Sequence, residues 1–283
     1  MPQPNLLKSF TRINPFKFYR LDFCLRNLGL GMIGIAAGLD RFNCTLALIA
    51  LINIFLIQAY SFSANNYYDY QVFGELNYIA RLRARGISLK LCFALCLLPL
   101  VLLAAILAAC PSYAAILFLY LLLFYCYQTP PFRLKNNYLL SILINAVCLG
   151  SILILYPHLF INQKLNALGA YFAVLYFCHL AFFELIHQIA HLGKDQIMSL
   201  PAKIGIGGTA NAIKIFQLLI IFLALAGWFM LPAEKLIFIT TLLFSLLRLR
   251  KLLCLPALQD NFLKLRERPD RFYALWEGLC YLV

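Results

Sequence analysis

The sequence has few charged residues, and this scarcity limits what kind of protein it can be. Only 12% of the 283 residues are Asp, Glu, Lys or Arg, whereas 63% are hydrophobic. Soluble domains are about a quarter charged, so this composition could not cover a surface that faces water. Together with a mean hydropathy of +0.83, it excludes a soluble globular protein and predicts an integral membrane protein.

Other features are missing as well. The ten cysteines are scattered and no two have the C-x-x-C spacing, which favours packing residues over a metal or redox pair. The N-terminus lacks a signal-peptide cleavage pattern. The apolar runs lack the alternation of a membrane strand, and backbone amides must be paired in hydrocarbon, so the spans are predicted to be helices. The predicted fold class is an all-α, polytopic membrane helix bundle.

The apolar runs define the predicted spans. A helix needs about 20 residues to cross a bilayer, and nine runs are candidates: 24–39, 43–64, 87–109, 112–128, 137–156, 166–192, 209–231, 234–254 and 271–283. The first, fourth and last are short, so we expect eight or nine transmembrane helices. Residues 1–21 mix basic and aromatic side chains and are predicted to form an interfacial, cytoplasmic arm. Residues 22–283 are predicted to be a single bundle domain.

The basic residues fall almost entirely on one side of the predicted spans. Of the 24 Lys and Arg residues, all but Arg41, Lys164 and Lys235 belong to the N-terminal arm or to even-numbered loops. Because cytoplasmic loops are enriched in Lys and Arg, the N-terminus is predicted to be cytoplasmic. The net charge of +13 therefore needs no nucleic-acid partner. A basic cytoplasmic rim suits anionic lipid headgroups or a diphosphate-bearing substrate.

The first group of polar residues stands at the end of the second predicted span. Asn65 and Asp69 are four residues apart, so on a helix they share one face and their oxygens could hold a hard cation. Asn77 and Arg81 repeat this spacing further along. Polar side chains inside a membrane are costly and are functional candidates by default. The alternative interpretation is an ordinary solvated helix C-terminus.

The second group stands at the end of the sixth predicted span. Glu184, His187, Gln188, His191 and Asp195 fall within an arc of roughly 100° on a helix. Glu184 with the two histidines could bind zinc or iron, or the histidines could hydrogen-bond to neighbouring helices. We favour a third interpretation, in which this stripe faces the Asn65 and Asp69 stripe across a cavity.

Between these groups, two prolines end the fourth predicted span. Pro130 and Pro131 stop a helix abruptly, which places Arg133 and Lys135 at the cytoplasmic boundary. There they could hold a phosphate group. Alternatively, they are only the flanking charges expected at a cytoplasmic helix end. Three such elements on one membrane face predict a single site.

These residues resemble the motifs of the UbiA-type intramembrane prenyltransferases, over most of the chain. Residues 65–73, N-N-Y-Y-D-Y-Q-V-F, are similar to the family motif N-D-x-x-D-x-x-x-D. Residues 127–135, Y-Q-T-P-P-F-R-L-K, are similar to Y-S-x-P-P-x-R-L-K. Residues 191–195, H-L-G-K-D, align with the second acidic motif D-x-x-x-D, after an E-x-x-H-Q segment at 184–188. Asn66, Phe73 and His191 stand where the family has acids.

The resemblance implies a transferase of isoprenoid biosynthesis that moves an isoprenyl group from a polyprenyl diphosphate to a hydrophobic, aromatic or lipid acceptor with the help of Mg²⁺. It implies metal ligands at Asn65, Asp69, Glu184, His191 and Asp195. It implies diphosphate contacts by Asn77, Arg81, Arg133 and Lys135. It implies catalytic roles for Asp69, His191 and Asp195. His187 and Gln188 would contact these residues and hold them in position.

Three other functions remain open at this stage. Loss of acids at positions 66, 73 and 191 should weaken Mg²⁺ binding, so the chain could be a binding or scaffold protein that kept the fold and lost catalysis. It could also be an enzyme of the same fold that performs other diphosphate chemistry, such as cyclisation. A transporter is the third alternative. The retained Asn65, Asp69, Asp195 and basic residues favour diphosphate handling.

Overall fold

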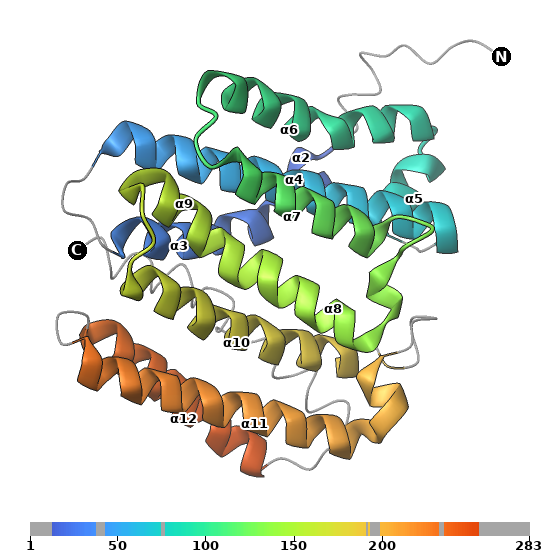
Figure 1. Ribbon diagram of the computed structural model, residues 1–283. Coiled ribbons are helices and arrows are strands. Elements are labelled where there is room, and N and C mark those ends of the chain that lie inside the picture. The colour runs from blue at the N-terminus through green and yellow to red at the C-terminus, as the bar shows by residue number, and fades with distance from the viewer. Residues whose placement is uncertain are drawn as a thin grey trace.

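The structure is a computed structural model, and it describes residues 13–37, 43–74, 77–190, 192, 199–231 and 235–254. Every regular element among these residues is a helix (Figure 1), which confirms the predicted all-α class. The last predicted span, 271–283, lies outside the described residues.

The helices correspond to eight of the nine predicted spans. Their bounds are α2 (Pro15–Phe18), α3 (Leu21–Ala36), α4 (Cys44–Phe73), α5 (Tyr78–Ala84), α6 (Leu89–Ala109), α7 (Ala114–Gln128), the 3-10 turn η1 (Leu134–Asn136), α8 (Tyr138–Asn145), the π-helical η2 (Ala146–Ile152), α9 (Leu153–Asn162), α10 (Ala167–Ala190), α11 (Leu200–Met230) and α12 (Lys235–Cys254). Helices α8, η2 and α9 follow one another without a break and make one span, 138–162.

Five of these helical segments are long and apolar enough to cross a membrane: α4, α6, the α8–α9 span, α10 and α11. Helix α7 is apolar but shorter. The structure therefore supports a multi-pass membrane protein, while the predicted total of eight or nine spans stays a prediction.

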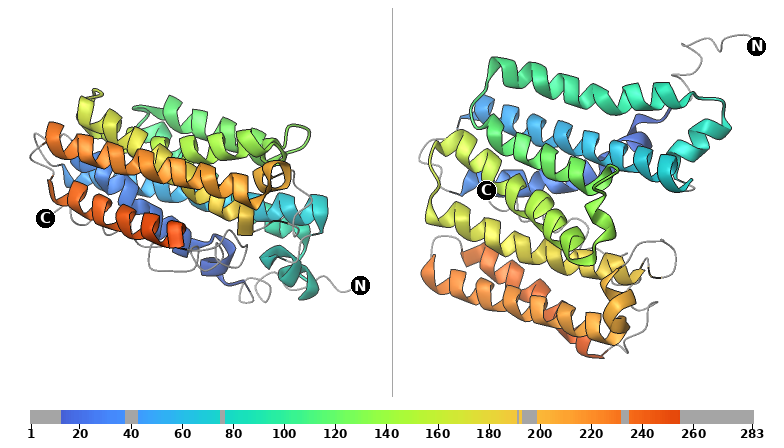
Figure 2. Two further views of the ribbon diagram at one scale, coloured as in Figure 1. Left: turned by 90° about the horizontal axis from the view of Figure 1, so that it is seen from below. Right: turned by 45° about the vertical axis from the view of Figure 1, so that its right-hand side comes forward.

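The long helices lie side by side with their axes roughly aligned (Figure 1). Helices α3 and α12 lie on one side of the row formed by the others (Figure 2, left). Helix α4 packs against α6 and α3, α3 packs against α9, and α11 joins α10 to α12. The core between them is rich in buried aromatic rings, among them Tyr120, Tyr156, Tyr176, Phe172 and Phe182.

Helix α4 is longer than predicted, and its length positions the site. The Asn43 side chain caps its start by accepting a hydrogen bond from the Leu46 N–H at 3.0 Å, and Gly74 ends it with a φ of 64°. Its 30 residues extend about 45 Å, well beyond a hydrocarbon core of about 30 Å. The last turns, which carry the first polar group, therefore reach the membrane boundary as ordered helix.

Helix α11 also differs from the prediction, because it begins at Leu200 rather than near residue 209. Pro201 occupies its first turn, where proline is tolerated because no helical donor is lost there. Gly205 adopts a φ of 76° inside this helix and kinks it. The first nine residues contain a proline, a lysine and three glycines, so the predicted apolar run did not include them.

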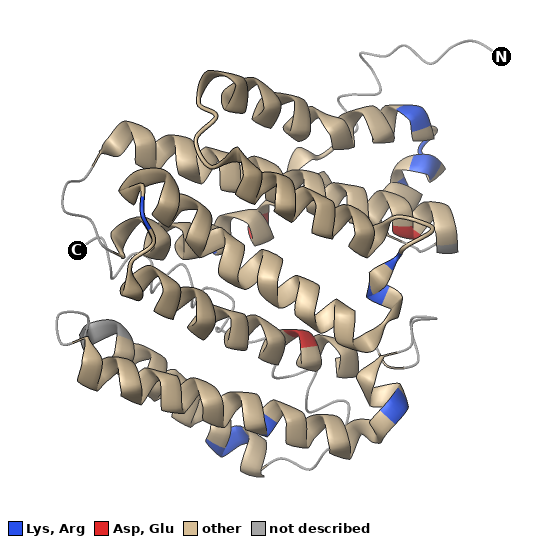
Figure 3. Cartoon of the chain, in the orientation of Figure 1, with Lys and Arg blue, Asp and Glu red and all other residues tan. Residues whose placement is uncertain are grey.

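Basic residues gather at one end of the bundle (Figure 3). This end holds α5, the start of α6, η1 and the start of α11, whereas the basic residues of α12 lie nearer the middle of the bundle (Figure 3). Lys164, in the turn between α9 and α10, lies at the opposite end. This distribution agrees with the predicted positive-inside orientation, which itself stays a prediction.

Candidate active site

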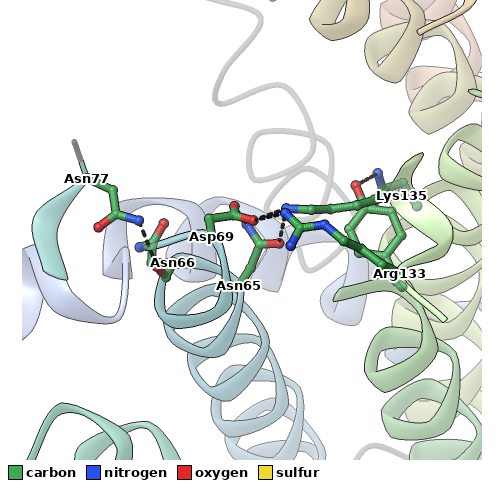
Figure 4. Close-up of polar contacts among 8 residues, drawn as sticks. Asn65, Asn66, Asp69, Asn77, Arg133 and Lys135 are labelled. Carbon is green, nitrogen blue, oxygen red and sulfur yellow. Dashed lines mark hydrogen bonds and ion pairs between the residues drawn. The ribbon is translucent and has the colours of Figure 1, made fainter. Parts of the chain in front are cut away.

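Asn65 and Asp69 lie on one face of α4, as their spacing predicts. The Asn65 Nδ2 donates a hydrogen bond to the Asp69 Oδ2 at 2.9 Å. This contact leaves the Asn65 Oδ1 and the Asp69 Oδ1 to face the interior of the bundle (Figure 4). Helix α4 thus presents an amide oxygen and a carboxylate oxygen together.

Arg133 and Lys135 reach this pair from the segment that follows α7. The Arg133 Nη2 lies 3.2 Å from the Asp69 Oδ1, and the Lys135 ammonium donates a hydrogen bond to the same oxygen. The Lys135 Nζ is also 3.4 Å from the Asn65 Oδ1. In Figure 4, both side chains extend toward Asn65 and Asp69 from the segment that faces the end of α4. The structure therefore brings together two predicted metal ligands and two predicted diphosphate contacts.

This ion cluster is almost completely buried. Asp69 is 7% exposed, Arg133 7% and Lys135 6%. Charges removed from water are expensive unless they are paired, and removing one partner of such a pair usually costs about 3–5 kcal/mol. Among these three residues, one carboxylate faces two cationic groups. The cluster is electrostatically suited to receive a further anion.

The local sequence explains how Arg133 and Lys135 reach the cluster. Helix α7 ends at Gln128, directly before Thr129 and the two prolines, and the chain then turns through η1. Arg133 has a left-handed backbone with a φ of 36°, which costs a non-glycine residue about 1 kcal/mol or more. Strained backbone of this kind persists where surrounding contacts fix it, and the ion pair with Asp69 is such a contact.

Glu184 belongs to a neighbouring polar network. Its Oε1 accepts a hydrogen bond from the Ser141 hydroxyl of α8 at 3.0 Å. The Tyr127 hydroxyl of α7 accepts one from the Asn145 Nδ2 at 3.0 Å, and it interacts electrostatically with the carboxylates of both Glu184 and Asp69. Tyr127 is therefore within electrostatic reach of both carboxylates.

The remaining members of the second polar group differ in their surroundings. Gln188 ties three elements together: its Nε2 donates to the Tyr138 carbonyl at 3.3 Å and its Oε1 accepts from the Leu200 N–H at 2.9 Å. His187 is partly exposed on the same helix. His191 and Asp195 lie outside the described residues. Within the described part of the chain, no three His, Cys, Asp or Glu side chains form a group that could hold a metal.

Asn77 and Arg81 line a separate pocket. The Asn77 Nδ2 donates to the Asn66 carbonyl at 2.7 Å, and its Oδ1 caps α5. The pocket has a volume of about 430 Å³ and is lined by Phe16, Lys17, Arg20, Asp22, Asn66, Asn77, Tyr78 and Arg81. No residue of the ion cluster is in this lining, so the diphosphate role predicted for Asn77 and Arg81 stays a prediction.

Two residues near the site were missed by the sequence reasoning. Ser141 donates a hydrogen bond to Glu184, and Asn145 donates one to Tyr127. Both are polar residues within an apolar span, which is itself a signal of function. Asn145 directly precedes the π-helical segment η2, and Ser141 lies one turn earlier in α8. Such segments are common at functional sites, but nothing in the sequence reveals a π-helix.

The fold and the site together define a class of protein: a multi-pass helical membrane protein with a buried, charge-rich cluster at the basic end of the bundle. The family model of the UbiA prenyltransferase family matches residues 28–266. The chain therefore belongs to this family, as the sequence resemblance predicted. Comparison with curated proteins gives no match.

Solved structures share the fold at low sequence identity. One, described as digeranylgeranylglyceryl phosphate synthase in membranes, is 15% identical with a TM-score of 0.71, covering 97% of this chain and 96% of its own. A UbiA homolog from Archaeoglobus fulgidus bound to DMAPP and Mg²⁺ is also 15% identical with a TM-score of 0.71, covering 95% and 99%. An apo UbiA homolog from Aeropyrum pernix K1 is 20% identical with a TM-score of 0.63, covering 93% and 95%.

Proposed function

We propose that this protein transfers an isoprenyl group from a polyprenyl diphosphate to a hydrophobic acceptor within the membrane, assisted by Mg²⁺. One observation carries the proposal: oxygen ligands and cationic side chains meet at one buried point, through Asn65, Asp69, Arg133 and Lys135. Membership of the prenyltransferase family supports it. So do the related structures with bound DMAPP or GPP and Mg²⁺.

The residues present fit a magnesium ion. The Asn65 Oδ1 and the Asp69 Oδ1 already converge on a positive charge, the Lys135 ammonium. Mg²⁺ prefers such hard oxygens, and in phosphate sites it commonly takes one or two carboxylates and completes its shell with water and substrate phosphates. Glu184, His191 and Asp195 remain predicted as further ligands. His191 and Asp195 also keep their predicted catalytic roles.

The basic residues would act on the leaving group. In the transfer, the bond between C1 of the allylic chain and the diphosphate oxygen breaks, and its electron pair leaves with the diphosphate. A nucleophilic atom of the acceptor then bonds to C1 and loses a proton. Bound Mg²⁺ would supply positive charge to the departing diphosphate. Arg133 and Lys135 would hold the same group by charge-assisted hydrogen bonds in a site with little water.

The proposal is tested with purified protein in lipid, labelled geranylgeranyl or farnesyl diphosphate and Mg²⁺, with and without membrane extract. We expect diphosphate release that depends on Mg²⁺. Asp69→Asn keeps the side-chain shape and removes the charge, so it should slow release by about 100-fold or more. A melting temperature for this variant separates lost chemistry from lost folding. A folded wild-type protein without any release would instead support the scaffold alternative.

A further inference from the structure

A second basic site lies on the other side of the end of α4. The 430 Å³ pocket is bounded by α2, the start of α3, the end of α4 and α5. In Figure 4, Asn66 and Asn77 lie on one side of the α4 end, and Arg133 and Lys135 lie on the opposite side. Lys17 and Arg20, two residues of this lining, have no role in the predicted site or in the proposed function.

The charge of the pocket is strongly positive. Its lining has three basic residues, Lys17, Arg20 and Arg81, and one acid, Asp22. Asp22 is already paired, because the Arg26 Nη2 lies 3.3 Å from its carboxylate. The Arg20 guanidinium lies over the Phe23 ring, 4.1 Å from its centroid. The exposed Lys17 and Arg81 are therefore the cations best placed to meet a ligand.

The described part of the N-terminal arm, residues 13–21, is fixed in place beside the pocket. The Asn14 N–H donates to the Tyr78 hydroxyl at 2.9 Å, and the Tyr19 hydroxyl donates to the Leu95 carbonyl at 2.9 Å. Burial raises the pKa of Tyr19 to about 12, so this phenol keeps the proton that it donates. Phe18 packs edge-on against Tyr19 and Tyr78. A pocket held in this way needs little ordering when a ligand enters.

The position of the pocket selects an amphiphilic ligand. It lies beside the last turns of the membrane span of α4, and Phe16, one of its lining residues, is 50% exposed. Aromatic rings next to Lys and Arg are typical of the membrane interface, where basic pockets bind anionic headgroups. A ligand with a phosphate and an apolar tail could satisfy both parts.

We propose that this pocket binds the phosphate headgroup of an anionic amphiphile, at a site distinct from the ion cluster around Asp69. Arg81 can grip a phosphate with two parallel N–H groups, and Lys17 supplies a point charge. The phosphate could belong to a membrane phospholipid or to a phosphorylated acceptor. The inference stands on the pocket alone and holds whether or not the proposed transfer occurs.

The test compares binding of phosphatidic acid and of phosphatidylcholine with the same acyl chains, by native mass spectrometry of the full chain in detergent. We expect one phosphatidic acid to bind about tenfold more tightly, and Lys17→Gln with Arg81→Gln to remove that preference. The matched control, Arg85→Gln with Lys90→Gln, removes the same charge from exposed positions at the same end. It should retain the preference. Equal loss in both double variants would overturn the proposal.

Two competitors complete the test. Inorganic diphosphate with Mg²⁺ should leave the bound phosphatidic acid in place. Displacement of phosphatidic acid would show that the two ligands share one site and would overturn the proposal. Displacement by glycerol phosphate would show that the headgroup suffices for binding, as a small phosphorylated acceptor requires. Phosphatidic acid that resists glycerol phosphate would show that the acyl chains contribute, as expected for a membrane phospholipid. None of these readings depends on turnover.

Discussion

In the proposed function, Lys135 occupies the position that the metal ion would take. Its ammonium bonds to the Asp69 carboxylate and lies 3.4 Å from the Asn65 Oδ1. An ammonium and a hard cation compete for the same oxygens, so a metal can enter only when the lysine moves away. A diphosphate arriving with the metal offers the lysine a new partner. At this residue, donor binding and metal binding are therefore expected to assist each other.

Replacement of this lysine tests the competition. Lys135→Gln should tighten Mg²⁺ binding in the absence of donor, by about tenfold, because a buried competing charge is removed. The same change should slow diphosphate release, because a cation is lost from the leaving group. Calorimetric titration with Mg²⁺ and the release assay measure the two effects. Lys164→Gln, at the opposite end of the bundle, is the control and should change neither. Weaker Mg²⁺ binding in Lys135→Gln would contradict the idea.

At the scale of elements, close approach of helix backbones sets the position of the spans. A Cβ added to Gly34 of α3 would lie 2.2 Å from the Ile154 carbonyl oxygen of α9. Membrane helices gain stability by such close packing, since lipid provides no hydrophobic drive between them. Helix α9 continues the span that begins with α8 and carries Ser141 and Asn145, so this contact also helps to position the polar network.

Gly34→Ala should therefore destabilise the bundle. The clash is with backbone, which cannot rotate away, and overpacking of this kind costs about 1–3 kcal/mol. A melting curve in detergent should show a clear fall in Tm. Gly207 of α11 is the matched control, because nothing lies within 4 Å of an added Cβ. Gly207→Ala should be neutral or stabilise by up to about 1 kcal/mol. An equal fall for both variants would show that helix contact at Gly34 is not the cause.

At the scale of the whole molecule, the distribution of charge predicts the orientation. The basic end of the bundle holds the ion cluster and the second pocket, so one membrane face carries both. If this face is cytoplasmic, both sites are open to ligands made in the cytosol or held in the inner leaflet. The described helices place these sites at the end of the spans rather than at their centre, where charge is most costly.

Cysteine labelling tests this orientation. On a background without native cysteines, a cysteine at position 83 should react with a membrane-impermeant reagent in permeabilised cells but not in intact cells. A cysteine at position 162, the last residue of α9, should react with the same reagent in intact cells. The 21 to 3 distribution of Lys and Arg is the physical reason. The reverse labelling pattern would overturn the orientation and the access of cytosolic diphosphates.

The sequence by itself determined the class, the helices and one half of the site. Composition required a membrane protein, and apolar runs located eight described helices, because hydrocarbon tolerates no unpaired backbone. The spacing of Asn65 and Asp69 predicted their shared face, because helix geometry is local. The motif resemblance identified the family. Span ends were less accurate, as in α4 and α11, because a helix continues past the membrane wherever its caps allow.

Only the tertiary structure decided which side chains meet. Arg133 and Lys135 are more than sixty residues from Asp69, and their convergence depends on α7 packing beside α4 and on the turn after it. The same packing placed Arg81 beside Lys17 in the lining of the second pocket. Charges act through space, so a site made from several helices is fixed by their packing and not by the order of residues along the chain.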